Sequence, residues 1–178
     1  MSYCEYCQVS SEPHQSNCIA TILNDYPRIS ERLNITKNAV FLGKGVNGRA
    51  YKLNSKNALK VTFSQKEYEN AEKLIGKQIK NVVKYYDAVE IRSRRERLFL
   101  IKMELLKPLS NLVYQEINEF VWDYFFYNRK LPVNSPIRKQ IVNGFENLKN
   151  LGINHTDLHT GNVMQSLRSN QIKIIDIM

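Results

Sequence analysis

Apolar residues follow two different periods along the chain, and the change between them divides the sequence into two parts. From Val40 to Leu106, apolar and polar residues alternate in short runs, which is typical of half-buried strands. From Leu109 onward, apolar residues return every three or four positions, which is the period of an amphipathic helix. The pattern predicts strands over 40–53, 57–63, 81–91, 98–106 and 172–178, helices over 64–77, 109–128 and 135–152, and a helix with a connector over 19–37.

End signals support these helices. Ser64 suits an N-cap with Glu67 three residues later, and Pro136 and Gly152 suit the start and end of the helix over 135–152. A strand-rich part with one helix followed by a helical part predicts an α+β fold of two lobes. The expected divisions are a Cys- and His-rich motif (1–20), a helical connector (21–39), a strand-rich lobe with its linker (40–106) and a helical lobe (107–178).

Composition narrows the class of protein. The chain has 178 residues, of which 43% are hydrophobic and 24% charged, as in globular proteins. No apolar run approaches the ~18 residues that span a bilayer, and no signal-peptide pattern opens the chain, so we expect a soluble cytoplasmic protein without a membrane partner. The net charge of +9 suits an anionic partner such as a nucleotide, nucleic acid or acidic protein. The positive charge has a second explanation of equal weight. Lys, Asn, Tyr and Ile are all abundant here, as AT-rich genomes tend to encode.

All three cysteines lie at the start of the chain. With one histidine they form Cys4-x2-Cys7-x6-His14-x3-Cys18, four ligands that suit tetrahedral zinc. The spacing resembles a zinc knuckle with a longer loop before the histidine. A tail with chance cysteines is the alternative. A knuckle of this kind would bind nucleic acid, through stacking on the neighbouring tyrosines, or dock a protein.

Three glycines interrupt the first predicted strands. Gly43, Gly45 and Gly48 have the G-x-G-x-x-G spacing. Alone, this spacing is weak evidence for nucleotide binding, because it also fits an ordinary glycine-rich hairpin. A dinucleotide fingerprint needs a helix directly after the glycines, but strand-forming residues follow here. The sequence therefore favours a hairpin whose backbone amides cover phosphates.

Lys60 lies between Leu59 and Val61 in the next predicted strand, where its side chain faces either solvent or an anionic group. A buried lysine needs an acidic partner. Glu67 is the first choice because it adjoins the apolar stripe of the following helix, although it also fits a capping box with Ser64. Glu72 is the competing partner.

The stretch NHTDLHTGNVM (154–164) concentrates polar residues in a predicted loop. Asp157 is placed to accept a proton from a hydroxyl, and Asn162 to ligate a divalent cation. His155 is expected to pack and hold the loop, and His159 to meet a transferred phosphate. Asp176, at the tip of the last predicted strand, would be a second metal ligand. Nearby oxygen ligands favour magnesium over a zinc site built from the two histidines.

Taken in order, these segments resemble the protein kinase-like superfamily over residues 40–178. ALKV is similar to the V-A-I-K strand, HTDLHTGN to H-R-D-L-x-x-x-N, and IDIM stands in place of D-F-G. The resemblance implies a two-lobe kinase-like fold that binds ATP with Mg²⁺ or Mn²⁺. It implies Asp157 as the catalytic base, Lys60 as the phosphate contact with Glu67, and Asn162 and Asp176 as metal ligands. The segment LIKMELL resembles the strand leading into the linker, with Met103 as gatekeeper and Glu104, Leu105 and Leu106 facing adenine.

Departures from the family pattern leave three functions to compare. Thr156 replaces the arginine of H-R-D, His159 replaces a lysine, and D-L-H-x-G-N is more similar to aminoglycoside phosphotransferases and atypical kinases. The sequence ends two residues after Asp176, which suggests a minimal kinase, viral in view of its composition and acting in host cytoplasm or the virion. We expect transfer to Ser/Thr of a protein, with a decoy that binds a partner kinase as the alternative and a small-molecule kinase ranked last.

Overall fold

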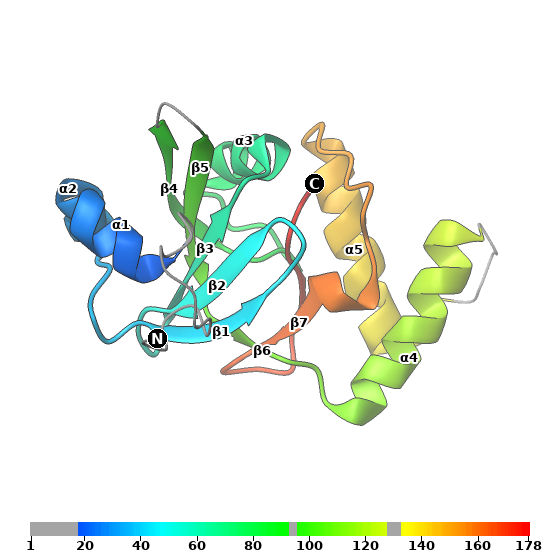
Figure 1. Ribbon diagram of the computed structural model, residues 1–178. Coiled ribbons are helices and arrows are strands. Elements are labelled where there is room, and N and C mark those ends of the chain that lie inside the picture. Colours follow the sequence, from blue (N-terminus) through cyan, green and yellow to red (C-terminus); the bar gives the residue numbers. More distant parts are fainter. Residues whose placement is uncertain (1–17, 93–95, 128–132) are drawn as a thin grey trace. The chain divides into compact units, whose positions relative to one another are not determined.

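The computed structural model describes residues 18–92, 96–127 and 133–178 (Figure 1). The chain divides into two compact units, the first made of residues 1–76 and 85–105 and the second of residues 77–84 and 106–178. Both units combine helices with an antiparallel sheet, which confirms the predicted α+β class. After Leu105, inside the predicted linker, the rest of the chain belongs to the second unit. Residues 77–84 also belong to the second unit, although the sequence grouped them with the strand-rich part.

The first unit is built on a five-stranded sheet in the order β1-β2-β3-β5-β4, with every neighbouring pair antiparallel. Its strands are β1 (Val40–Lys44), β2 (Gly48–Lys52), β3 (Asn57–Thr62), β4 (Tyr85–Arg92) and β5 (Arg97–Glu104). The turn between β2 and β3 forms because the Asn54 side chain accepts hydrogen bonds from the backbone N–H groups of Lys56 (2.8 Å) and Asn57 (3.0 Å). This turn is the one the sequence predicted over residues 54–56.

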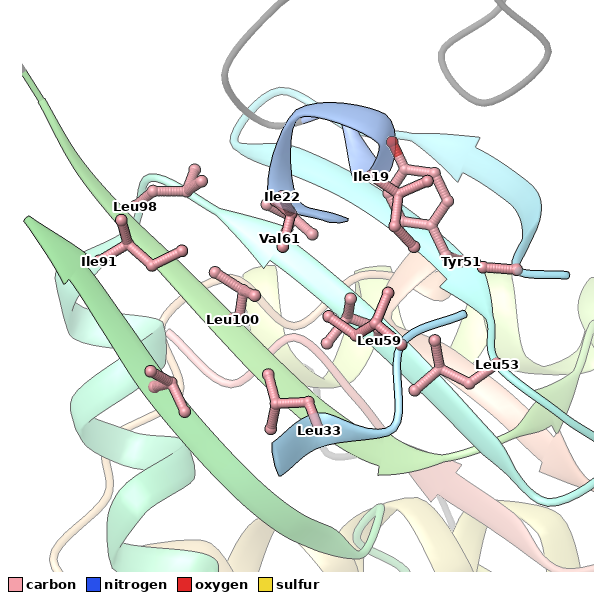
Figure 2. Close-up of a cluster of buried hydrophobic side chains, with 13 residues drawn as sticks. Ile19, Ile22, Leu33, Tyr51, Leu53, Leu59, Val61, Ile91, Leu98 and Leu100 are labelled. Atoms are coloured by element: carbon pink, nitrogen blue, oxygen red, sulfur yellow. The ribbon is translucent and has the colours of Figure 1, made fainter. Parts of the chain in front are cut away.

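Two short helices, α1 (Ile19–Asp25) and α2 (Pro27–Leu33), cover one face of this sheet. Ile19, Ile22 and Leu33 are fully buried and pack with sheet residues that alternate along β3 and β5, among them Leu59, Val61, Leu98 and Leu100 (Figure 2). The segment is therefore part of the core of the first unit. The sequence had suggested a connector here, because each helix has only seven residues and too few apolar positions to reveal a period.

Helix α3 (Gln65–Leu74) packs against β4 and β5. Its N-cap is Ser64, whose hydroxyl accepts from the Glu67 N–H (3.2 Å), as predicted. The buried residues of α3 are Glu67, Asn70, Ala71 and Leu74, so the buried face is more polar than the predicted apolar stripe. Tyr68 lies at its margin and stacks on Phe99 with ring centroids 4.8 Å apart.

The second unit contains α4 (Asn111–Val121), α5 (Pro136–Asn150) and a three-stranded antiparallel sheet in the order β6-β7-β8. Its strands are β6 (Leu106–Lys107), β7 (Val163–Ser166) and β8 (Ile172–Ile174). Helix α4 continues as a π-helix, η1 (Trp122–Phe126), where the sequence predicted one α-helix to residue 128. Helix α5 begins as expected, with the Ser135 hydroxyl accepting from the backbone and Pro136 in the first turn, and Gly152 follows it with φ of 71°.

Residues 77–84 are tied to β8 by backbone hydrogen bonds. The Val83 N–H donates to Ile174 O (3.0 Å), and the Ile174 N–H donates to Asn81 O (2.9 Å). Asn81 has φ of 63° and is 1% exposed, and its Nδ2 donates to Ile172 O (2.9 Å). β8 thereby gains a partner on its other side. In the described residues, no helix is long and apolar enough to cross a membrane.

Candidate functional site

The glycine segment forms the hairpin that the sequence predicted. β1 and β2 pair antiparallel, and the Gly45 N–H donates to Gly48 O (2.9 Å) across the turn. The turn is also held to β3, because Asn47 O accepts from the Phe63 N–H (2.9 Å) and from the Thr62 hydroxyl (3.1 Å). A strand follows the glycines directly, so the geometry of a dinucleotide-binding helix is excluded.

The three glycines differ in what the fold requires of them. A Cβ atom at Gly48 would lie 2.2 Å from Val61 O, so close packing on β3 demands glycine there. A Cβ atom at Gly43 or Gly45 would meet nothing within 4 Å. Neither has a positive φ, and Gly43, which lies in β1, costs stability there relative to alanine, whereas Gly45 lies in the turn between β1 and β2. Close packing therefore requires glycine at position 48, whereas at Gly43 and Gly45 the bare backbone has open space beside it.

Lys60 lies in a row of small side chains across the sheet. Gly43 on β1 is opposite Ala50 on β2, Ala50 is opposite Lys60 on β3, and Lys60 is opposite Ile101 on β5. Residues directly opposite each other in an antiparallel sheet share a face. The stem of Lys60 is thus flanked on the hairpin side by a methyl group and a bare backbone. We call Gly43, Ala50, Lys60 and Glu67 the Lys60 site.

Glu67 is the partner of Lys60. Lys60 Nζ lies 2.7 Å from Glu67 Oε1, and the two side chains are 13% and 3% exposed. The prediction of this pair is confirmed, and the competing Glu72 instead accepts a hydrogen bond from the Tyr68 hydroxyl (2.7 Å) at the surface. Of the two roles that the sequence offered for Glu67, its carboxylate takes the ion pair with Lys60, and it does not complete the capping box, because the Ser64 N–H donates to Thr62 Oγ1 (3.1 Å).

The residues expected to face adenine lie where β5 ends. Met103 pairs with Ala58 on β3, and Glu104 pairs with Asn57. The Leu105 N–H donates to Lys56 O (2.8 Å), so that backbone donor is already used within the first unit. Leu106 opens β6 in the second unit, opposite Ser166. Met103, Leu105 and Leu106 are buried, and Glu104 is half-buried.

In the second unit, residues 155–162 form a loop, which we call the aspartate loop. It follows α5 and ends in the short 3₁₀-helix η2 (Thr160–Asn162). Asn162 Nδ2 donates to Asp157 O (2.7 Å) and lies 3.5 Å from Asp157 Oδ2. The Asn162 N–H donates to His159 O (2.9 Å). Asn162 therefore folds the loop back onto Asp157, and its Oδ1 is left as the end that suits a cation.

Asp176 is brought to the same place by the backbone, because the Ile175 N–H donates to Asn162 O (2.9 Å). β8 ends at Ile174, so Asp176 lies beyond the strand rather than at its tip, with φ of 52°. Left-handed backbone at a residue other than glycine is a strained conformation that often marks a functional position. Asp157, Asn162 and Asp176 are thus neighbours within one unit, as the sequence predicted for this part of the site.

The amide oxygen of Asn162 and the carboxylate oxygens of Asp176 are of the chemical type that magnesium binds. In the described residues, no three His, Cys, Asp or Glu side chains gather as a metal site. Magnesium commonly takes only one or two protein ligands and completes its shell with water and phosphate oxygens. Two protein oxygens would be enough for a magnesium ion bound together with phosphate, whereas a zinc site would need more protein ligands.

The two histidines of the loop have different surroundings. His155 is 3% exposed, and burial lowers its pKa, which favours the neutral ring. Its Nδ1 lies 3.4 Å from both the backbone N and O of Met178, while the Thr156 N–H donates to Met178 O (2.9 Å). His155 has the packing role expected of it. His159 is half-exposed, with Nδ1 accepting from the Gly161 N–H (3.0 Å) and Nε2 3.8 Å from Asp157 Oδ2.

One residue of this site carries no signal in the sequence. Asn118 on α4 accepts a hydrogen bond at Oδ1 from the Thr160 hydroxyl (2.8 Å), which anchors η2 to the helix. Thr160 is 4% exposed and Asn118 is half-buried, so the bond is partly shielded from water. Asn118 is 42 residues from its partner, and an asparagine in a helix gives no indication of such a contact.

The predicted zinc ligands Cys4, Cys7 and His14 lie outside the described residues. Cys18 is described, and it is fully buried directly before α1. The zinc site stays a prediction. No family model and no curated protein sequence matches the chain.

Proposed function

We propose that this chain is a phosphotransferase that uses ATP and magnesium, and that it transfers the γ-phosphate of ATP to a Ser or Thr hydroxyl of a protein. The observation that carries the proposal is the Lys60–Glu67 ion pair at 2.7 Å beside the glycine hairpin. An ion pair in this position needs an explanation, because desolvating two charges usually costs as much free energy as their attraction returns. The explanation we propose is that the Lys60 ammonium, fixed by Glu67, binds an anion.

The Lys60 site offers phosphate a positive charge with small neighbours. The ammonium is fixed by Glu67, and the adjoining row of Ala50 and Gly43 leaves space on the hairpin side of the lysine stem. The bare backbone of Gly43 and Gly45 allows close approach of phosphate oxygens. In the proposed reaction, Lys60 binds the α- and β-phosphates, and the hairpin covers them.

The aspartate loop suits the transfer step. Asp157 would accept the proton of the attacking hydroxyl, whose oxygen forms the new bond to phosphorus as the bond to ADP breaks. Asn162 and Asp176 would hold magnesium, which neutralises charge on the phosphates when bound. The proposal requires the Lys60 site and the aspartate loop to act on the same ATP molecule. The protein acceptor is taken from the sequence resemblance.

Direct transfer from labelled ATP tests the proposal. The purified full chain is incubated with MgATP and protein substrates, and nucleotide affinity is measured in parallel by calorimetry. We expect Lys60→Met to weaken ATP binding and Asp157→Asn to abolish transfer while ATP still binds. Lys66→Met and Glu146→Gln, at exposed positions, are matched controls and should behave as wild type. ATP binding without transfer to any acceptor would favour the kinase-like decoy, and absence of both would refute the proposal.

A further inference from the structure

The imidazole ring of His159 packs against the backbone of Gly161. The Gly161 N–H donates to His159 Nδ1 (3.0 Å), and a Cβ atom at Gly161 would lie 2.7 Å from His159 Cε1 and 2.9 Å from Nδ1. The φ of Gly161 is not positive, so backbone conformation does not require glycine there. With the imidazole ring in its present place, a Cβ atom at this position would displace the ring of His159 from the backbone.

This contact decides which ring nitrogen carries the proton. In a neutral imidazole, one nitrogen donates and the other accepts. Since Nδ1 accepts from the Gly161 N–H, the proton is on Nε2. Nε2 is also the atom that faces Asp157, at 3.8 Å from Oδ2. The ring is therefore held in the form that presents a donor to the carboxylate.

Two donors converge on the same oxygen of Asp157. Oδ2 is approached by His159 Nε2 at 3.8 Å and by Asn162 Nδ2 at 3.5 Å. No hydrogen bond joins Oδ1 to any of the described residues. Both distances are longer than a good hydrogen bond, as is common for catalytic contacts before the substrate binds. The arrangement distinguishes the two carboxylate oxygens, because both donors approach Oδ2 and no donor of the described residues bonds to Oδ1.

We infer that His159 is a positioning residue for Asp157, seated on Gly161, and that it holds Oδ2 so that Oδ1 accepts the proton of the attacking hydroxyl. This rests on the proposed function, and it replaces the expectation that His159 contacts the transferred phosphate. If His159 contacted phosphate through Nδ1, it would lose the hydrogen bond from the Gly161 N–H. If it contacted phosphate through Nε2, the ring would have to turn away from Asp157.

The inference separates two kinetic outcomes. A residue that orients the base acts on the transfer step, so its loss lowers kcat, with the affinity for ATP unchanged. A residue that contacts the phosphate in the ground state raises the KM for ATP when it is removed. Misplacing a catalytic group by about 1 Å costs about 10²-fold in rate, which sets the expected size of the effect.

Two amide substitutions each preserve one of the two contacts that the His159 ring makes. His159→Asn places a carboxamide near Nδ1 and keeps an acceptor for the Gly161 N–H, whereas His159→Gln places one near Nε2 and keeps a donor for Asp157. We expect kcat to fall about 10²-fold in His159→Ala and His159→Asn, with partial recovery in His159→Gln and the Kd for ATP unchanged in all three. Recovery by Asn rather than Gln, or a raised Kd for ATP with kcat unchanged, would overturn the inference.

A measurement that needs no activity separates this inference from the proposed function. Nitrogen NMR of protein labelled in histidine reports which ring nitrogen is protonated, and His159→Gln identifies the signal of His159. We expect the Nε2-protonated form at about pH 8, where imidazole is neutral, and loss of that preference in Gly161→Ala. A His159 ring protonated on Nδ1 would refute the geometry even in an active kinase. The expected form in a protein that transfers no phosphate would refute the proposed function, and with it the catalytic use of this geometry.

Discussion

Removing one partner of the Lys60–Glu67 pair should destabilise the protein more than removing both. The side chains are 13% and 3% exposed, so a charge left without its partner has little access to water. Breaking a fully buried pair costs about 3–5 kcal/mol, and the partial exposure of Lys60 places the cost for Glu67→Leu nearer 3 kcal/mol. Lys60→Met should cost a similar amount, because the carboxylate loses its ammonium while remaining buried.

The double variant Lys60→Met/Glu67→Leu should recover most of this loss. Replacing a buried pair by apolar side chains of similar volume is often neutral or stabilising. We therefore expect a coupling free energy of about 2–3 kcal/mol between the two sites, measured by urea unfolding of the wild type, both single variants and the double variant. The double variant should fold yet have lost affinity for ATP, which would show that the pair serves binding rather than stability.

Additive effects of the two substitutions would refute this reasoning. Additivity would mean that each side chain finds compensation elsewhere, and that the 2.7 Å contact contributes little to either. Lys66→Met and Glu69→Gln provide the matched control, since both residues are exposed on α3 and their effects should each stay within about 0.5 kcal/mol.

Three further predictions concern other parts of the chain. Gly48→Ala should lower the free energy of unfolding, because its Cβ would meet Val61 O at 2.2 Å, whereas Gly43→Ala should weaken ATP binding without loss of stability; urea unfolding and calorimetry distinguish them. Burial lowers the pKa of His155 below 6.5, so the unfolded chain binds more protons and stability should fall as pH drops through 6.5; His155→Phe should flatten that dependence in unfolding curves. The purified protein should contain one zinc ion, lost in Cys4→Ser, by elemental analysis.

Local signals were enough to predict the parts of the first unit that form between neighbours in sequence. The glycine hairpin, the turn after β2 and the Ser64 cap all join residues a few positions apart, so their residue types alone indicate the geometry. The Lys60–Glu67 pair was predictable for the same reason, since a strand and the next helix bring residues seven apart together. The kinase-like arrangement of both units stays a proposal.

Features that depend on distant residues were not predictable. Strand β7 has four residues, and its pairing with β6 requires a partner almost sixty positions earlier. The predicted strand over 81–91 began too early, because Val82 and Val83 are apolar and buried but bond to β8, and β4 starts at Tyr85. The short helices α1 and α2 showed no period, although they cover a face of the sheet. In each case the apolar pattern indicates that a segment is buried, but it does not indicate which distant element the segment contacts.

Asn162 explains how the aspartate loop is assembled. Its N–H is bound by His159 O, its carbonyl by the Ile175 N–H, and its Nδ2 by Asp157 O, at 2.9, 2.9 and 2.7 Å. One residue thus fixes the loop that carries Asp157 and the segment that carries Asp176, using backbone groups for two of the three bonds. Asn162→Asp would keep an oxygen that could bind the proposed metal but would replace the donor to Asp157 O with a second acceptor. If the proposed function is correct, the variant should therefore retain affinity for cations and still misplace Asp157, the proposed base.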